Sequence, residues 1–382
     1  MVKHTKRKKN TMVIWILLVL LFLWMCLHYL PVQLEHFRPL PEATALIPLL
    51  LVPLLIIFLI TLSRRAWAQS FVSLLLIAIE VLWSLGYFMP LPHALASLLA
   101  MPDQTAQTAQ TAQTAASASP TKSAASARSA TPTASATSTT PTSAAQTITV
   151  MTINARYGRA DTSSILHQVK LHKVDVLCVQ EVTSRFVDRL DHEGISQELP
   201  FKQLGNYSSK DNGGFNAIWT RIQPIEAHPQ SISISSSQIP TVTLSVNGQR
   251  VLFASTHPKS PGRGGASWSS SISSLSAFSK INNADLKNSS QVTANVVMGD
   301  LNSNLHHAVL RSVLSSGLTD SSYALHKGMN LTFPASWPFF PALIEIDHVL
   351  YTGQIQATSL TTQTIPHTDH KALIATLQVK NR

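Results

Sequence analysis

Polar side chains stand at the ends of several apolar stretches in the second half of the chain. The stretch NVVMGDLN, residues 295–302, ends in Asp300 and Asn302. Four similar stretches end in Asn154, Glu181, His257 and Asp347, and a final one is preceded by Asp369 and His370. Short apolar runs of this kind are typical of buried strands, and strands support polar groups rigidly at a sheet edge. We therefore predict one site composed of these eight residues.

The residue types indicate metal-assisted hydrolysis of a phosphate ester. Glu181, Asn154 and Asp369 offer hard oxygen ligands, which suit Mg²⁺ or Mn²⁺. The sequence contains no cysteine pair and no HxxxH array that would favour a softer metal. These three residues are therefore the predicted metal ligands.

The other five residues have the types needed for proton transfer and charge stabilisation. His370 is suited to exchange a proton, with Asp347 fixing its tautomer and raising its basicity. His257, as a donor, would neutralise charge on the phosphoryl oxygens in the transition state. Asp300 and Asn302 would orient the attacking water.

The elements that must position these residues combine crossovers with hairpins. ITVMTIN and DVLCVQE predict two strands, and the segment DTSSILHQVKLHKVD between them has helical spacing. TVTLSVNGQRVLFASTH predicts a hairpin that turns at Asn247 and Gly248. Further strands are predicted at 293–302, 345–353 and 370–379, with a helix after Asn304. Since strands outnumber helices, the predicted fold is an α/β sandwich of two β-sheets.

Six segments together resemble the ordered signature set of the endonuclease/exonuclease/phosphatase superfamily, which has the deoxyribonuclease-I-like fold. They are INARYG, VQEV, STHPKSP, MGDLNS, IDHVL and HTDHKAL. They occur in family order, and the resemblance covers residues 148–382. It implies a four-layer α/β/β/α catalytic domain and a Mg²⁺-dependent phosphoric ester hydrolase.

Carried over by position, the same resemblance assigns roles to individual residues. It implies metal binding at Glu181 and Asn154 with help from Asp369, a dyad of His370 and Asp347, water activation at Asp300, and phosphate contacts at Asn302 and His257. Thr368 replaces the serine of the usual SDH triplet, a change expected to be silent. Many nuclease members place a tyrosine near the phosphate, and here only Tyr157 and Tyr207 are candidates by position. Nuclease activity is therefore less favoured than phosphoesterase activity in general.

The first hundred residues predict a membrane anchor. The mean hydropathy of the whole chain, +0.14, is too high for an ordinary soluble protein. Segments of about 20 residues at 11–30, 43–62 and 71–90 are each apolar and long enough to cross a bilayer as a helix. Five Lys or Arg residues precede the first span, and Arg64 and Arg65 separate the second from the third. The positive-inside rule then places the N-terminus in the cytoplasm and residues after 90 outside.

Residues 101–147 are rich in Ala, Ser, Thr and Gln and have almost no large apolar side chains. Such a segment cannot bury a core, so we predict a disordered linker. It would tether the domain at 148–382 loosely to the membrane. The loop at 333–343, with Trp337, Phe339 and Phe340, is expected either to dip into the membrane interface or to fold over its own core.

The three spans, the linker and the outer domain are similar to membrane-bound members of the superfamily that are linked to teicoplanin and vancomycin resistance. This resemblance implies a cell-envelope phosphatase that acts on polyprenyl phosphate or diphosphate lipids. One alternative is a surface nuclease or phosphodiesterase, but residues 148–382 carry a net charge of only +4 without clustered arginines. Nucleic acid is therefore a less favoured partner than the lipid bilayer. A catalytically dead binding module is the third alternative.

Five further residues carry weaker expectations. His306 and His307 are expected to be solvated residues of a first helical turn. Asn216 follows two glycines that permit a turn, and it either faces the site or has no role there. Arg263 either clamps a second phosphate or is a loop cation. Glu80, inside the third predicted span, is expected to be hydrogen bonded between helices.

Overall fold

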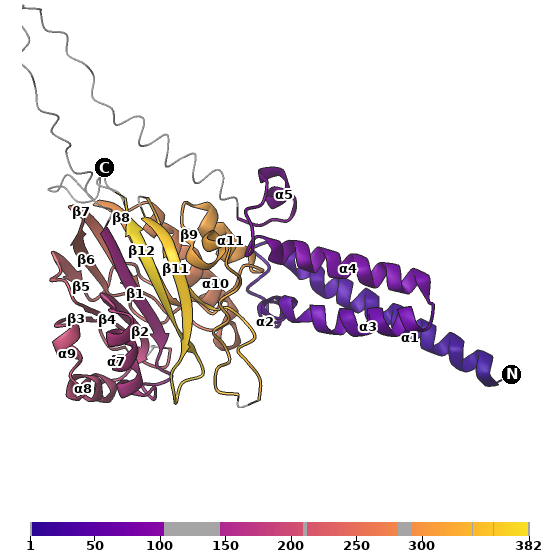
Figure 1. Ribbon diagram of the computed structural model, residues 1–382, viewed down its shortest axis with the longest axis horizontal. Helices are drawn as coiled ribbons and strands as arrows, with labels where there is room; N and C mark the ends of the chain where they lie inside the picture. Colours follow the sequence, from indigo (N-terminus) through magenta and orange to yellow (C-terminus); the bar gives the residue numbers. More distant parts are fainter. Residues whose placement is uncertain are drawn as a thin grey trace, which may run out of the picture.

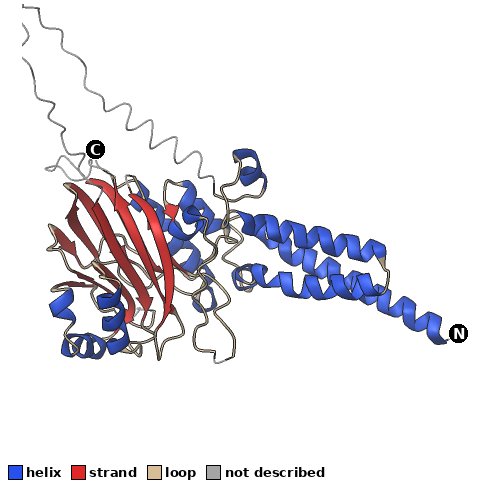
Figure 2. Ribbon diagram, in the orientation of Figure 1, coloured by secondary structure: helices blue, strands red, loops and turns tan. Residues whose placement is uncertain are grey.

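Two β-sheets pack face to face in the computed structural model, which describes residues 2–102, 146–208, 212–281, 292–337, 339–353 and 355–380 (Figures 1 and 2). The first sheet consists of β1 (Gln146–Asn154), β2 (Val176–Val182), β3 (Phe201–Leu204), β4 (Phe215–Thr220), β11 (Ile355–Thr364) and β12 (Lys371–Val379). The second consists of β5 (Glu226–His228), β6 (Thr241–Val246), β7 (Gln249–Ser255), β8 (Val292–Asp300), β9 (Thr319–Asp320) and β10 (Asp347–Tyr351). The predicted sandwich of two sheets is therefore confirmed.

The strand order combines local hairpins with longer connections. It is β11-β12-β1-β2-β4-β3 in the first sheet and β5-β6-β7-β8-β10-β9 in the second. The predicted hairpin joins β6 to β7, and Asn247 and Gly248 have φ angles of 54° and 71°. Both values suit the left-handed turn that an Asn-Gly pair favours. The buried core between the sheets is made by inward-facing residues such as Val150, Phe253 and Val296.

Helices cover the outer face of each sheet. The first sheet is covered by α7 (Thr162–Leu171), α8 (Ser184–His192) and α9 (Ile195–Glu198), and the second by α10 (Gly265–Ser274), α11 (Ala308–Ser315) and α12 (Ser321–Leu325). Helix α7 begins where its sequence predicts, because the Asp161 carboxylate accepts a hydrogen bond from the Ser164 amide at 2.8 Å. The sandwich thus has the layer order helix, sheet, sheet, helix (Figure 2).

The N-terminal part forms a helical bundle beside the sandwich. It contains α1 (Val2–Met25), α2 (Leu40–Ala45), α3 (Leu51–Ser63), α4 (Trp67–Leu85) and α5 (His93–Leu98). Two helical segments, Thr11–Tyr29 and Trp67–Leu85, are long and apolar enough to span a membrane. The region of the second predicted span has a shorter apolar helix, Ile47–Ser63, so three spans are not confirmed. Pro41 and Pro48 divide this region into short helical pieces because proline begins a helix but interrupts its interior.

The bundle is not loosely attached to the sandwich. Most of the predicted linker lies outside the described residues, but the bundle itself packs on α10, α11 and α12 (Figure 1). Leu18 and Trp83 of the bundle belong to the same buried apolar cluster as Leu310 and Leu314 of α11. The expectation of a loosely tethered domain is therefore wrong for the described residues. Extensive apolar burial between two elements holds them at a defined orientation.

Buried polar contacts complete this interface. Both oxygens of the Glu35 carboxylate accept hydrogen bonds from the first turn of α11, from the Ala308 amide at 2.6 Å and the Val309 amide at 2.8 Å. The Arg311 guanidinium donates to the His28 carbonyl at 2.6 Å. Glu35 thus caps α11 from a distant part of the chain, as a carboxylate does at the positive end of a helix.

His306 and His307 are part of the same interface, which corrects the expectation that they are solvated. His306 is 6% exposed, and its Nδ1 lies 3.0 Å from the Nδ1 of His28. His307 is fully buried and donates through Nε2 to the Pro41 carbonyl at 2.9 Å. Burial lowers the pKa of His307 to about 4, so the imidazole that contacts the Pro41 carbonyl is neutral. The sequence shows only the helix start, whereas the bundle supplies the residues that cover it.

Replacing Glu35 with Ala is expected to loosen this interface. Two amides at the start of α11 would lose a charged acceptor, a loss of about 2 kcal/mol in local stability. Hydrogen exchange at Ala308 and Val309 measures it directly, and their protection should fall. Glu42→Ala is the matched control, because Glu42 makes only a partly exposed ion pair with Arg38, which contributes at most about 1 kcal/mol. Equal protection in the two variants would contradict the capping role of Glu35.

Glu80 differs from its expected role. It is buried at 1% exposure, yet neither carboxylate oxygen has a hydrogen-bond partner among the described residues. Its expected hydrogen bond between helices is therefore not present there.

Candidate active site

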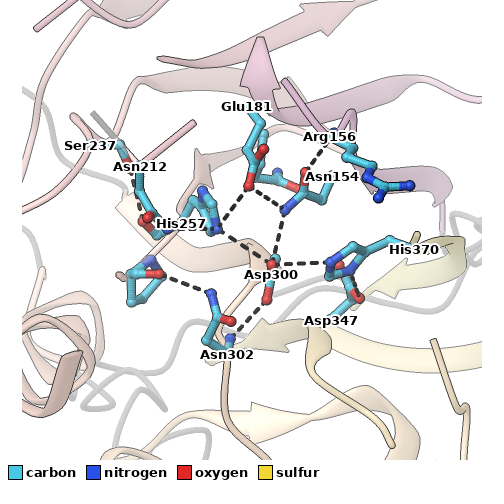
Figure 3. Close-up of polar contacts among 12 residues, drawn as sticks. Asn154, Arg156, Glu181, Asn212, Ser237, His257, Asp300, Asn302, Asp347 and His370 are labelled. Carbon is cyan, nitrogen blue, oxygen red and sulfur yellow. Dashed lines mark hydrogen bonds and ion pairs between the residues drawn. The ribbon is translucent and has the colours of Figure 1, made fainter. Parts of the chain in front are cut away.

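One edge of the sandwich gathers polar side chains from both sheets. Asn154 ends β1 and Glu181 lies near the end of β2, which runs parallel to it. Asp300 ends β8 and is paired in register with Asp347, the first residue of β10. The structure brings seven of the eight predicted residues to this edge: Asn154, Glu181, His257, Asp300, Asn302, Asp347 and His370 (Figure 3).

Asp300 occupies the centre of this group. Its Oδ2 accepts a hydrogen bond from the Asn154 amide at 3.0 Å and lies 3.4 Å from His257 Nε2 and 3.5 Å from His370 Nε2. Figure 3 shows Asp300 between the two imidazoles. Burial by itself would raise the pKa of Asp300, but the charge on His370 and the hydrogen bonds from His257 and Asn154 hold it well below its usual range. The carboxylate is therefore ionised at neutral pH.

His370 and Asp347 form a buried pair beside it. His370 Nδ1 lies 2.8 Å from Asp347 Oδ2, and Asp347 is fully buried. Burial would lower the pKa of His370, but the nearby charges of Asp347 and Asp300 raise it to about 10. The imidazolium then donates through Nδ1 to Asp347 and points Nε2 at Asp300. The group can donate a proton or a hydrogen bond to a phosphoryl oxygen.

Glu181 is held in a strained position next to Asn154. Its Oε1 lies 3.3 Å from the Asn154 amide nitrogen, and its Oε2 accepts a hydrogen bond from the Tyr157 backbone at 2.8 Å. Glu181 has a φ of 53°, a conformation that non-glycine residues seldom adopt outside functional sites. Gly213 lies directly on this side chain, and a Cβ there would come within 2.5 Å of the Glu181 carboxyl. Only glycine lets the loop approach so closely.

The donor set fits a hard divalent cation. Glu181 and Asp300 lie on either side of one Asn154 amide, so two carboxylates share a single neutral partner. Oxygen-rich groups of this kind suit Mg²⁺ or Mn²⁺. Ligand atoms of Asp300, Asp347 and His370 also lie within 4.8 Å of one another. We favour Glu181 and Asn154 as ligands, because His370 and Asp347 are already hydrogen bonded to each other.

Asp369 stands apart from this group. Its side chain is 26% exposed, and Oδ2 lies 3.4 Å from Nε of Arg156. It therefore lies at the rim of the site, and its contribution to metal binding stays a prediction.

Asn302 and His257 flank Asp300 on the side of the second sheet. The Asn302 backbone donates to Asp300 Oδ1 at 2.8 Å, and its side chain donates to the Pro258 carbonyl at 3.1 Å. His257 Nε2 lies 3.1 Å from the amide nitrogen of Asn212. The His257 side chain therefore faces Asp300, whereas the Asn302 side chain is held by the Pro258 carbonyl, and its phosphate contact stays a prediction.

Asn212 is a site residue that the sequence analysis missed. It is 3% exposed, and its Oδ1 accepts a hydrogen bond from Arg263 at 2.6 Å while its nitrogen faces His257. The sequence pointed to Asn216 instead, whose amide donates to Ser237 and Gln238 and does not contact the site among the described residues. Both amides flank the same pair of glycines, so no signal in the sequence separates them.

Two small residues hold the central strands at the correct spacing. Gly299, immediately before Asp300, passes so close to β7 that a Cβ would lie 1.9 Å from the Thr256 carbonyl oxygen. The Thr368 hydroxyl donates to the Asn154 carbonyl at 2.7 Å and accepts from the His370 amide at 3.2 Å. A serine hydroxyl could make the same contacts, which agrees with the expectation that threonine at this position is silent.

Comparisons with known proteins give the family. The model of the Endonuclease/Exonuclease/phosphatase family matches residues 151–370. Humanized TDP2 from D. rerio is a similar solved structure, with 14% identity, a TM-score of 0.49, and coverage of 60% of this chain and 98% of that one. The endonuclease/exonuclease/phosphatase from Beutenbergia cavernae DSM 12333 is 18% identical, with a TM-score of 0.47 and coverage of 62% and 72%.

A Bacteroides thetaiotaomicron family protein is 17% identical, with a TM-score of 0.46 and coverage of 62% and 96%. No curated protein matches the sequence. At these identities and TM-scores the solved structures support no conclusion about this chain. The family match, however, spans more than half of the chain and includes every predicted site residue. The chain belongs to the endonuclease/exonuclease/phosphatase family.

Proposed function

We propose that this protein is a membrane-anchored, metal-dependent phosphoesterase that hydrolyses lipid-linked phosphates, with polyprenyl phosphate or diphosphate as the expected substrates. The family is one of phosphoric ester hydrolases, and the site has the acids, amides and imidazoles that such chemistry requires. The membrane part of the proposal rests mainly on an exposed aromatic loop that touches the site.

The chemistry follows from the arrangement around Asp300. Its ionised carboxylate orients the attacking water by accepting a hydrogen bond from it. His370 and His257 donate hydrogen bonds to the phosphoryl oxygens, on which negative charge increases in the transition state. When bound, a divalent cation would polarise the phosphoryl group, with Glu181 and Asn154 as its ligands and Asp369 assisting.

The loop at 333–343 borders this site. At its base the Phe333 ring lies 5.0 Å from the His370 ring, and the Ala335 amide donates to the Asp369 carbonyl at 2.6 Å. Its other aromatic side chains do not pack on the domain: Trp337, Phe339 and Phe340 are 52%, 89% and 64% exposed. These exposures argue against a loop folded over its own core.

The position of the loop suits contact with a membrane surface. In Figure 1 the orange-yellow loop projects from the lower edge of the sandwich, beside the end of the bundle that meets the sandwich. Helices of the bundle expose large apolar side chains, among them Leu20 at 56%, Val52 at 60% and Leu59 at 61%. A bilayer around those helices would bring its interface close to this loop, and tryptophan and other aromatic residues favour that interface. The site would then act on phosphates at the lipid surface.

Vesicles that contain the full-length protein test this proposal. Wild-type protein with Mg²⁺ should release phosphate from polyprenyl diphosphate in the bilayer and from a short-chain, water-soluble analogue. The triple variant Trp337→Ser, Phe339→Ser, Phe340→Ser should lose about tenfold or more on the bilayer substrate, because each aromatic contributes about 1 kcal/mol or more of interfacial contact. Its rate on the soluble analogue should stay unchanged.

Ile225→Ser is the matched control, since Ile225 is also exposed, at 46%, but belongs to the loop before β5. Equal losses on both substrates would mean that the loop supports the site and not the membrane contact. Phosphate release from neither lipid, together with cleavage of a single-stranded oligonucleotide, would replace the lipid proposal with the nuclease alternative.

A further inference from the structure

A hollow lined by arginines adjoins the site. We call it the arginine pocket; it has a volume of about 580 Å³, and its wall includes Arg156, Tyr157, Arg159, Arg185, Arg189 and His367. None of its described lining residues is a carboxylate. These four arginines form no cluster in the sequence because they belong to two separate segments. The parallel pairing of β1 with β2 brings the two segments together.

The pocket shares a wall with the proposed metal ligands. The Arg156 amide donates to Asn154 Oδ1 at 2.8 Å, and the Tyr157 amide donates to Glu181 Oε2 at 2.8 Å. Two adjacent residues of the pocket are thus bonded to the two expected ligands. The pocket therefore lies directly beside the proposed metal ligands.

The guanidinium groups of the pocket differ in how they are held. Arg189 donates to the carbonyls of Gly158 and Ala160 and packs on the Phe186 ring, so its role is structural. Arg159 lies over the Tyr157 ring, 5.6 Å from the ring centre. Arg185, in the first turn of α8, has no hydrogen bond or ion pair within the described part of the chain. Arg159 and Arg185 therefore have donors available for a ligand.

Nearby carboxylates neutralise this charge only in part. Asp161, Asp188 and Glu193 line a separate hollow of about 360 Å³, to which Arg185 and Arg189 also contribute. Asp161 is already occupied as the cap of α7, where it accepts from Ser163 and Ser164. The arginine pocket itself therefore favours an anion, and planar guanidinium groups bind phosphate oxygens in pairs.

We propose that the arginine pocket binds a second phosphoryl group of the substrate, so that the protein prefers a diphosphate to a monophosphate. This inference rests on the proposed function and narrows its substrate class. The water oxygen bonds to the terminal phosphorus, and the bond from that phosphorus to the bridging oxygen breaks. The electron pair stays on the bridging oxygen, which leaves as the lipid monophosphate. The other product is inorganic phosphate, and the proton from water is released to solvent.

The pocket would stabilise the part of the substrate that gains the most negative charge in the reaction. The leaving lipid monophosphate gains negative charge as the bridging bond breaks, and guanidinium groups beside it stabilise that charge. A monophosphate substrate has no second phosphoryl group to place in the pocket. Loss of the arginines should therefore affect the two substrates differently.

Full-length protein in detergent, with prenyl diphosphate and prenyl monophosphate of equal chain length, tests this inference. The double variant Arg159→Gln, Arg185→Gln should lose about 100-fold in kcat/KM for the diphosphate, because each charge-assisted hydrogen bond contributes about tenfold. Its kcat/KM for the monophosphate should change less than about threefold. Titration with inorganic diphosphate should show weaker binding to the variant than to wild-type protein.

Arg221→Gln is the matched control. Its side chain is 36% exposed, and it pairs with Asp175 and Glu198 at the opposite end of the first sheet, away from the pocket. Equal losses on both substrates in the double variant, or no loss on either, would overturn the inference. Failure of the proposed function gives a different result: wild-type protein would hydrolyse neither prenyl substrate, whatever the titration with inorganic diphosphate shows.

Discussion

Replacing Asp300 with Asn is expected to lower kcat by about 10³-fold while the protein stays folded. The amide can keep the hydrogen bond from the Asn302 backbone, which is 2.8 Å long in the native site. It cannot supply the negative charge that faces His257 and His370. General-base and electrostatic contributions of this kind are each about 10²- to 10⁴-fold. Steady-state hydrolysis of the lipid substrate measures the loss, and thermal unfolding confirms that the fold is intact.

Asp320→Asn is the control for this variant. Asp320 belongs to a second buried Asp–His pair in the same sheet, with its Oδ2 2.8 Å from His348 Nδ1. Burial would lower the pKa of His348, but its hydrogen bond to Asp320 raises it to about 9. Because neither residue contacts Asp300, this variant should lose stability and keep kcat within about threefold. A loss below tenfold for Asp300→Asn would remove Asp300 from the centre of the mechanism.

Replacing Gly299 with Ala is expected to destabilise the protein by about 3 kcal/mol or more, and to reduce activity as well. The new Cβ would lie 1.9 Å from the Thr256 carbonyl oxygen, which belongs to the backbone beside β8 and has little freedom to move. The φ of 150° adds strain for any residue with a side chain. Overpacking and backbone strain each contribute about 1–3 kcal/mol. Asp300, the next residue, would shift with the strand.

The variant Gly248→Ala separates the two causes of destabilisation, overpacking and backbone strain. Gly248 also has a positive φ, 71°, but a Cβ there would meet nothing within 4 Å. Only the conformational strain applies, so this variant should lose about 1 kcal/mol and keep full activity. Thermal unfolding of the full-length protein, followed together with phosphate release, compares the pair. Equal destabilisation in both variants would show that β8 can move away from β7, and that Gly299 does not set the position of Asp300.

Several strands and one hairpin of this protein can be predicted from short stretches of its sequence. Alternating and continuous apolar runs predicted β1, β2, β8 and β12, because a strand with buried faces must be apolar wherever it lies in the chain. The Asn247 and Gly248 pair predicted the hairpin through its backbone preference. Polar residues at the strand ends then indicated the site. The polar strand β11 and the short strands β5 and β9 were missed, since they have little apolar pattern of their own.

Contacts between segments that are far apart in the chain cannot be predicted from local sequence patterns. Glu35 caps α11 from 273 residues away, and the bundle covers His307 with Pro41. By local reasoning His307 is a solvated residue at a helix start, because nothing near it in the sequence could bury it. Asn212 and Asn216 likewise have the same local surroundings, and only the fold directs one of them toward His257.

By itself, the sequence determined the apolar strands β1, β2, β8 and β12, the polar residues that end the strands, and the strongly apolar character of the first hundred residues. These properties depend on neighbours in the chain, through backbone preference and periodic burial. The tertiary structure alone decided that the bundle docks on α11, that four arginines from two segments line one pocket, and that the loop at 333–343 touches His370. Those contacts join residues that are far apart in the chain, and their stability comes from burial and charge in three dimensions, which no local pattern encodes.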